Sequence, residues 1–336
     1  MVKLSFVIPA YNEENHIRKC LGSICEQAQK YSDSVEIIVV NNASTDRTAE
    51  IAASYPGVQV VHEPRKGIVW ARRAGYLKSS GELIANVDSD TILTPNWLDT
   101  VFREFSKNPN LVGLSGPFKY YDLPKLTSRM INFFYKLAYG LYLLNRFVLR
   151  KGSMLQGGNF IVTRAGLEKI GGYDTSIEFY GEDTNIARRL HEIGDVKFTS
   201  KLPMHSSGRR LAEEGPLTMA IKYTRNYFWM TFFKKPKDNT YIDHRPQDSG
   251  QPTRQIKRTK REILFGVCIA SITFIILAGG AFATYLIGKQ IIASDFSINE
   301  AKAATLKWEK RISADIVTFS HKTKAQIQNT IREIKE

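Results

Sequence analysis

Residues 4–14, LSFVIPAYNEE, form an apolar run that ends in a proline and a cluster of polar side chains. A short, continuous apolar and β-branched run of this kind predicts a buried strand. Similar runs recur in VEIIVVNNASTD at 35–46, VQVVH at 58–62 and LIANVDSD at 83–90. Helical spacing and capping residues separate the runs, which predicts a parallel sheet covered by helices on both faces. The chain is therefore predicted to open with an α/β domain.

The polar clusters that follow these strands belong to one predicted site. Tyr11 and Glu13 follow the first strand, Asn42 the second, and Asp88 and Asp90 the fourth. The carboxyl ends of parallel strands share one edge of a sheet, where ligands bind. Two carboxylates at this spacing suit Mg²⁺ or Mn²⁺ together with phosphate oxygens. We therefore expect these residues to converge on one cleft around a divalent cation.

Several classes of protein are excluded by the composition and by missing motifs. No GxGxxG follows a strand and no GxxxxGK[ST] occurs, which argues against a dehydrogenase and a P-loop nucleotidase. Cys20, Cys25 and Cys268 fit neither a disulfide framework nor a metal motif, and we interpret Cys20 and Cys25 as reduced, structural thiols. The net charge of +14 is spread along the chain, so a nucleic-acid partner is not expected.

Further charged residues allow two interpretations each. Lys66 and Arg72 either belong to a solvated helix face or pair with a bound diphosphate. Glu182 and Asp183 precede a helical pattern, where a carboxylate caps the helix and interacts with its dipole, or acts as a general base. His205, considered alone, is better explained as a surface or core histidine than as a metal ligand.

Residues Ile263–Gly288 form a run of 26 residues without a charged side chain. About 20 apolar residues cross a bilayer, so the run predicts one transmembrane helix. Basic side chains gather before the run rather than after it, which places the N-terminal part in the cytoplasm and residues 289–336 outside the cell. The predicted organisation is an α/β domain at 1–233, a basic proline-containing linker at 234–261, a transmembrane helix at 262–288 and an amphipathic helical tail at 289–336.

Two other apolar segments resemble surface helices more than spans. Residues 130–149 are interrupted by Lys136, Asn145 and Arg146, which favours an interfacial or core helix. Residues 217–235 are basic and aromatic, a composition that suits the membrane surface and a protein core equally well.

An ordered set of motifs resembles family 2 glycosyltransferases of the GT-A fold over about residues 4–210. The motifs are VIPAYNEE (7–14), VVNNASTD (39–46), RKGIVWARRAG (65–75), VDSD (87–90), GGNFIVTRAGLEKIGGYD (157–174) and GED (181–183). The resemblance implies a Rossmann-like, mostly parallel sheet and an inverting, metal-dependent hexosyl transfer from a nucleotide-sugar, in the first place a UDP-sugar.

The resemblance also implies roles for individual residues. Asp183 matches the family's catalytic base, Asp90 is the main ligand of Mg²⁺ or Mn²⁺, and Asp88 and His205 complete the metal site. Asn42 stands where the family usually carries an aspartate that contacts the base. The implied substrate-binding residues are Ala10, Tyr11, Glu13, Asn42, Lys66, Arg72, Asp88, Gly158, Asn159 and Glu182.

The absence of the QxxRW motif of processive synthases favours the transfer of a single sugar. The predicted anchor favours a lipid-linked or glycan acceptor at the cytoplasmic face of the cell membrane, in glycan or envelope polysaccharide synthesis. Three alternatives are a polyprenyl-phosphate glycosyltransferase, a sugar-phosphate nucleotidyltransferase on a similar fold, and a non-catalytic, membrane-tethered binding protein. The nucleotidyltransferase is disfavoured because PAYNEE stands where that class carries a glycine-rich loop.

Overall fold

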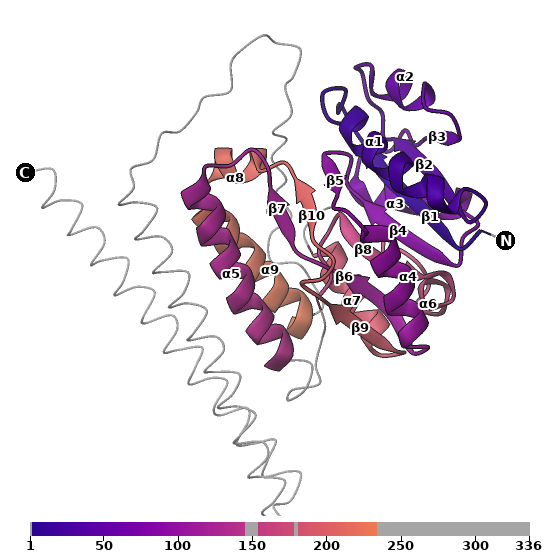
Figure 1. Cartoon of the computed structure of the whole chain (residues 1–336). Coiled ribbons are helices and arrows are strands. Elements are labelled where there is room, and N and C mark those ends of the chain that lie inside the picture. The colour runs from indigo at the N-terminus through magenta and orange to yellow at the C-terminus, as the bar shows by residue number, and fades with distance from the viewer. Residues whose placement is uncertain (1, 145–153, 178–180, 234–336) are drawn as a thin grey trace, which may run out of the picture. The chain divides into compact units, whose positions relative to one another are not determined.

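The computed structural model describes residues 2–144, 154–177 and 181–233 (Figure 1). A seven-stranded sheet forms the centre of this part of the chain, in the order β3-β2-β1-β4-β8-β6-β9. Neighbouring strands are parallel except that β8 is antiparallel to both β4 and β6. The strands are β1 (Leu4–Ala10), β2 (Val35–Asn41), β3 (Val58–His62), β4 (Leu83–Val87), β6 (Leu111–Ser115), β8 (Asn159–Thr163) and β9 (Asp195–Phe198). The prediction of a mostly parallel sheet is thereby confirmed.

A second, three-stranded sheet carries residues of the predicted site. It comprises β5 (Thr91–Leu93), β10 (Met204–Ser206) and β7 (Phe118–Tyr120). Strand β10 lies between the other two, antiparallel to β5 and parallel to β7. Because β5 begins directly after Asp90, this small sheet brings the second half of the chain to the end of β4.

Helices cover both faces of the large sheet, as predicted, because the side chains of its strands alternate between two apolar clusters. Leu4, Phe6 and Ile8 of β1 face the cluster that includes α1 and α4, whereas Val7 faces the cluster that includes α3 and α7. The helices are α1 (Ile17–Ala28), the 3₁₀ turn η1 (Gln29–Tyr31), α2 (Thr48–Ala53), α3 (Ile68–Lys78), α4 (Trp97–Lys107), α5 (Lys125–Leu144), α6 (Arg164–Lys169), α7 (Glu182–His191), α8 (Arg209–Glu214) and α9 (Pro216–Phe233).

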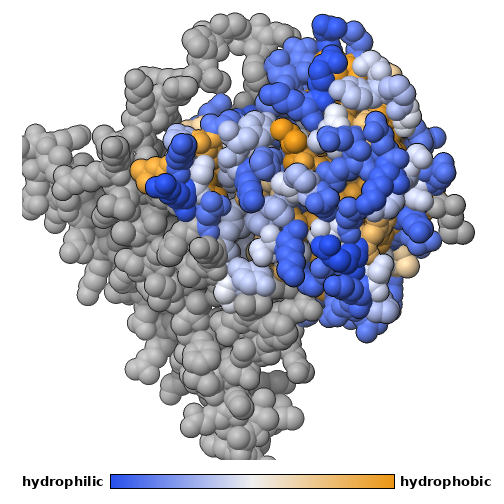
Figure 2. All heavy atoms as spheres, viewed as in Figure 1, coloured by the Kyte–Doolittle hydropathy of each residue, from blue (hydrophilic) through white to orange (hydrophobic). Residues whose placement is uncertain are grey.

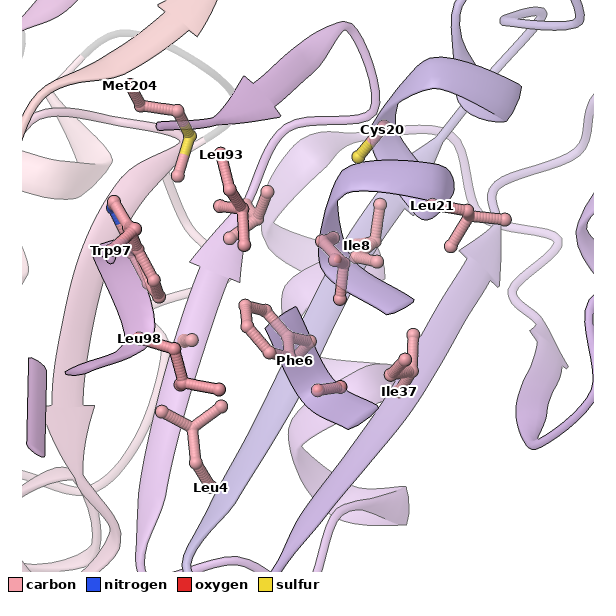
Figure 3. Packing of buried hydrophobic residues seen from close by; sticks show 14 of the residues in the cluster. Leu4, Phe6, Ile8, Cys20, Leu21, Ile37, Leu93, Trp97, Leu98 and Met204 are labelled. Atoms are coloured by element: carbon pink, nitrogen blue, oxygen red, sulfur yellow. The ribbon is translucent and has the colours of Figure 1, made fainter. Parts of the chain in front are cut away.

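The first cluster is an ordinary close-packed core (Figure 3). The rings of Phe6 and Trp97 lie 5.8 Å apart between centroids, and both side chains are almost fully buried. Cys20 is buried in the same cluster as a free thiol, in agreement with its interpretation as reduced. Burial of each large side chain contributes roughly 1.5–3 kcal/mol. The viewed surface is mostly hydrophilic, with apolar side chains showing between the charged ones (Figure 2).

Helix α3 approaches the sheet unusually closely at Gly75. A Cβ at this position would lie 2.4 Å from Cγ1 of Val7 and 2.9 Å from Cγ2 of Val40, distances that only glycine avoids. Arg72 stands three residues earlier and therefore shares this face of the helix. The close approach thus directs Arg72 inward, toward the carboxyl ends of the strands.

The apolar segments 130–149 and 217–235 are helical where the structure describes them. The first belongs to α5 and the second to α9. Within the described ranges, no helix is both long and apolar enough to cross a bilayer. The predicted linker at 234–261, the transmembrane helix at 262–288 and the tail at 289–336 lie outside the described residues, as does Cys268.

Candidate active site

The strand register brings the polar clusters of the first half to one edge. Ala10 at the end of β1 is opposite Asn41 at the end of β2, and the N–H of Asn42 donates to the carbonyl of Ala10 at 2.8 Å. Val87 at the end of β4 is opposite Asn159 at the start of the antiparallel strand β8. The turn before β8 therefore meets Asp88 directly after β4, so both halves of the chain contribute to this edge.

Arg72 connects the two halves through buried charge. Its side chain is only 2% exposed, and its guanidinium donates to Oε1 of Glu182 and, at 3.2 Å, to Oδ1 of Asp88. Burial disfavours the charged guanidinium, but the two carboxylates outweigh this effect and raise the pKa of Arg72. Arg72 thus lies beneath the site and positions two acids; it is not exposed to a diphosphate.

Glu182 and Asp183, adjacent in the first turn of α7, have different surroundings. Burial raises the pKa of Glu182 to about 7, although the charge of Arg72 opposes the shift. Glu182 is buried and paired, whereas Asp183 is partly exposed. Of the two carboxylates that the sequence left open as candidates for a base, Asp183 is the one that a ligand can reach.

A turn of two glycines lies between Asp88 and Asp183. Gly158 has a φ of +78°, and a Cβ there would lie 2.1 Å from Oδ2 of Asp88. The N–H of Gly157 donates to Oδ2 of Asp183 at 3.0 Å, while the carbonyl of Gly158 accepts from the N–H of Asp88 at 3.2 Å. Only glycine permits both the positive φ and the close approach to Asp88. One turn therefore fixes Asp88 and Asp183 in the same part of the molecule.

Asp183 is held in one orientation by backbone donors. In addition to Gly157, the N–H of Thr184 donates to its Oδ1 at 2.7 Å. Burial raises the pKa of Asp183, and these hydrogen bonds and the charge of Arg72 partly oppose the shift. The helix-end and the base interpretations of this residue are compatible, because the bond to Thr184 satisfies a backbone N–H in the first turn of α7 while Asp183 remains partly exposed.

Asp90 lies in an acidic environment that one arginine partly neutralises. Its side chain is 16% exposed, and its Oδ2 lies 3.1 Å from a guanidinium nitrogen of Arg209. Burial is the main cause that raises the pKa of Asp90 to about 6; Arg209 opposes the shift, and the nearby charges of Glu13 and Asp88 add to it. Asp88 is 34% exposed, so neither carboxylate of the Asp-x-Asp motif is sealed from solvent.

Glu13 contacts the same arginine. It is 1% exposed, accepts from Arg209 on both carboxylate oxygens, and lies 3.1 Å from Nδ1 of His16. The carboxylate of Glu13, which the resemblance implied to bind substrate, is thus hydrogen-bonded within the protein. The sequence analysis did not identify Arg209, for which the only signal was a basic pair shortly after His205.

The side chains of Asn42 and Asn159 also form hydrogen bonds within the protein. Asn42 donates to the carbonyls of Glu63 and Arg65 at 3.0 and 2.7 Å and accepts from the N–H of Gly67 at 2.8 Å. This explains the departure from the family's aspartate, because a carboxylate has no N–H to donate to two carbonyls.

Asn159, predicted to border the sugar, is fully buried. Its amide donates to the carbonyls of Gly116 and Leu202, both at 3.0 Å, and accepts from Nε1 of Trp97. Its side chain joins the two sheets and is not available to a ligand.

Tyr11 and Lys66 form the solvent-facing part of the edge. Nζ of Lys66 lies 4.4 Å from the centroid of the Tyr11 ring and donates to its hydroxyl at 2.7 Å. Ala10, by contrast, is buried at the end of β1. An aromatic ring beside an exposed cation can contact both a base and a phosphate.

His205 does not join the acidic residues. It lies in β10 opposite Ile92 and Lys119, and burial, followed by the charge of Lys119, lowers its pKa. Among the residues that the structure describes, no three His, Cys, Asp or Glu side chains converge closely enough to hold a metal ion. The resemblance implied that Asp88, Asp90 and His205 form one metal site. The described structure does not show these three side chains as such a group.

The role of Arg72 predicts a large effect on stability. In Arg72→Met, the carboxylate of Glu182 stays buried without its partner, and the free energy of unfolding should fall by about 3–5 kcal/mol. Arg72→Met/Glu182→Met should recover part of the loss because the uncompensated charge is removed. Urea unfolding of the full chain measures both. The control is Arg47→Met, which breaks an exposed pair with Glu50 and should cost about 1 kcal/mol or less. Equal losses in Arg47→Met and Arg72→Met would contradict this role.

The bonds of Asn42 predict a second effect. Asn42→Asp places an oxygen against the carbonyls of Glu63 and Arg65, and unfolding should become easier by about 1–3 kcal/mol. Asn12→Asp is the matched control, since Oδ1 of Asn12 accepts from the N–H of Thr45 at 2.8 Å and aspartate keeps this bond. If both variants unfold at the same urea concentration, the hydrogen bonds of Asn42 to Glu63, Arg65 and Gly67 do not stabilise the fold.

Comparisons with known proteins agree with this geometry. Residues 5–171 match the family described as Glycosyl transferase family 2. The chain is 31% identical over 207 residues to the probable glycosyltransferase YdaM of Bacillus subtilis, covering 57% of this chain and 47% of that protein. It is 33% identical over 113 residues to the putative glycosyltransferase EpsH of the same organism, covering 32% of each. The chain thus spans less than half the length of these curated relatives.

Two solved structures share the fold. A mannosyltransferase from Pyrobaculum calidifontis, PcManGT, in complex with GDP-Man and Mn²⁺, aligns over 92% of this chain and 80% of its own, with a TM-score of 0.55 and 18% identity. Residues 1–349 of TarS from S. aureus align over 69% of this chain and 73% of their own, with a TM-score of 0.50 and 17% identity. At these identities the likeness concerns the fold alone. The family match assigns residues 5–171 to a family 2 glycosyltransferase domain, and the described part of the chain has a GT-A-like fold.

Proposed function

We propose that the chain transfers one sugar from a nucleotide-sugar to a hydroxyl of an acceptor, with inversion at the anomeric carbon. The observation that carries the proposal is the double-glycine turn, which donates a hydrogen bond to Asp183 through Gly157 and packs against Asp88 at Gly158. A partly exposed acid beside the Asp-x-Asp motif is what a single displacement needs. The family match favours this reaction over that of a sugar-phosphate nucleotidyltransferase.

Asp88 and Asp90 are the residues that we propose would hold a divalent cation. Their fit follows from the chemistry of the donor set, because Glu13 and Asp88 place further negative charge beside the buried carboxylate of Asp90. Carboxylate oxygens suit Mg²⁺ or Mn²⁺. A bound cation would neutralise the charge that builds on the departing nucleoside diphosphate. The presence of GDP-Man and Mn²⁺ in the structurally similar mannosyltransferase supports a nucleotide-sugar donor of this kind.

Asp183 is proposed as the general base. Burial raises its pKa, so its carboxylate takes up a proton more readily than an exposed aspartate. As the acceptor oxygen forms its bond to the anomeric carbon, the bond from that carbon to the diphosphate oxygen breaks on the opposite face. The hydroxyl proton passes to Asp183, and the nucleoside diphosphate leaves with the bonding electron pair. Gly157 and Thr184 hold the carboxylate in place, so little conformational entropy is lost in orienting it during the reaction.

The donor's base and ribose are proposed to lie on the Tyr11 side of the edge. Lys66 is exposed and Tyr11 is half-buried, whereas Glu13, Asn42 and Arg72 act from beneath by holding loops and acids in place. A UDP-sugar is the donor class that we propose first.

The acceptor is proposed to be lipid-linked, at the cytoplasmic face of the cell membrane. The support comes from the sequence: the uncharged run at Ile263–Gly288 and the basic residues before it. Transfer of one sugar, rather than polymerisation, is proposed because the QxxRW motif is missing. The enzyme would then serve glycan or envelope polysaccharide synthesis.

The proposed reaction is tested with the full chain in detergent, Mn²⁺, a membrane lipid extract and a panel of labelled UDP-sugars and GDP-mannose. We expect one donor to give both free nucleoside diphosphate and a labelled product, with activity lost on chelation and restored by Mn²⁺. Labelled lipid supports the proposed acceptor class. Failure of every donor to release nucleoside diphosphate, with or without acceptor, would contradict the proposed function.

The role of Asp183 predicts a loss confined to turnover. Asp183→Asn should lower the rate by roughly 10²–10⁴-fold because the acceptor proton has no base, while the affinity for nucleoside diphosphate stays close to that of the wild type. Initial rates and calorimetric titration measure the two quantities. Asp33→Asn, which changes an exposed aspartate before β2, is the control and should leave both unchanged. A near-normal rate for Asp183→Asn would show that another group accepts the proton.

A further inference from the structure

Arg209 lies outside the family match at 5–171 but contacts two acids that belong to its motifs. One guanidinium nitrogen lies 3.0 Å from Oε2 of Glu13 and the other 3.1 Å from Oδ2 of Asp90. Glu13 is 1% exposed, whereas Arg209 is 23% exposed. The guanidinium therefore has a buried partner on one side, a proposed metal ligand on the other, and access to solvent.

The backbone around Arg209 is fixed by separate contacts. Both the hydroxyl of Ser207 and the N–H of Gly208 donate to Asp122, each at 2.6 Å. The N–H of Ser207 also donates to the carbonyl of Asp90 at 3.2 Å. The start of α8 is thus attached to the same residue that the Arg209 side chain contacts, and the arginine does not reach Asp90 by chance from a free surface segment.

The charges around Arg209 determine how it affects the binding of a cation and of a diphosphate. Its guanidinium contacts the carboxylates of both Glu13 and Asp90 and so neutralises part of their charge. A divalent cation on Asp90 would meet a positive charge already there, and like charges at this separation repel. A diphosphate changes the balance, because its oxygens accept hydrogen bonds from a guanidinium and neutralise both cations.

We infer that Arg209 is a positioning residue that serves as the counter-ion of Asp90 in the free enzyme and of the donor diphosphate in the complex. Arg209 therefore opposes binding of the metal alone and favours binding of the metal together with a nucleoside diphosphate. The inference rests on the proposed function, because it needs a metal and a diphosphate at Asp90. It makes the site selective for the nucleotide complex over the free metal ion.

The test uses the full chain and two probes. Mn²⁺ alone is titrated by electron paramagnetic resonance of the free ion, and UDP and GDP are titrated calorimetrically in saturating Mn²⁺. For Arg209→Met we expect Mn²⁺ alone to bind about threefold more tightly, because a repelling charge is gone. The nucleoside diphosphate that the wild type binds should bind about tenfold more weakly, because a charged hydrogen bond is lost. Arg47→Met is the control for the loss of an exposed arginine and should change neither affinity.

The opposite signs separate this role from a structural one. If Arg209 only supports the fold, both affinities should fall together or stay unchanged, and either result would overturn the inference. Because Arg209→Met leaves Glu13 buried without its guanidinium, the same comparison is repeated between Glu13→Gln and Glu13→Gln/Arg209→Met, where the expected signs are the same. A wild type that binds neither UDP nor GDP with Mn²⁺ would refute the proposed function and this inference with it. Wild-type binding without the opposite shifts would refute the inference alone.

Discussion

The buried guanidinium of Arg72 is the constraint on which the rest of the site depends. Removing the charges of Arg72 and Glu182 from water costs several kcal/mol per ion, and their mutual attraction offsets this only if the geometry is good. Arg72 meets that condition by contacting an acid from each half of the chain, Asp88 after β4 and Glu182 at the start of α7. The two halves of the site are thereby held in one register, and neither acid can move without leaving a charge unpaired.

Glycine supplies the close approaches that this arrangement needs. Gly75 lets α3 lie against β1 and β2, which directs Arg72 inward, and Gly158 lets the turn before β8 pack directly against Asp88. The neighbouring N–H of Gly157 then holds Asp183. The ion pair of Arg72 with Glu182 therefore fixes α3 against α7. The glycines determine how closely Asp88 and Asp183 approach the turn between them.

The sequence predicts most of the fold because its signals are local. The apolar runs at 4–10, 35–41 and 83–87 are strands as expected, and parallel order alone places their ends at one edge. The direction of a side chain at a strand end is not a local property. Asn42 and Asn159 point into the protein because of backbone groups that their own neighbourhoods in sequence do not reveal.

The contact of Arg209 with Glu13 joins residues 196 positions apart, and no periodicity marks it. His205 shows the same limit. Its motif context suggested a metal ligand, but the pairing of β10 with β5 and β7 places it beside Ile92 and Lys119.

The net charge of the site restricts which ligands can bind there. Two buried or half-buried guanidiniums, those of Arg72 and Arg209, stand against a larger number of carboxylates within one connected set of contacts. These carboxylates are Glu13, Asp88, Asp90, Glu182 and Asp183. An anionic diphosphate would be repelled by such a surplus of negative charge, although the exposed Lys66 at the rim supplies a further cation. The divalent ion that we propose at Asp88 and Asp90 would reverse the sign of the local charge. Under the proposed function, these acids would explain why a nucleotide binds together with its metal.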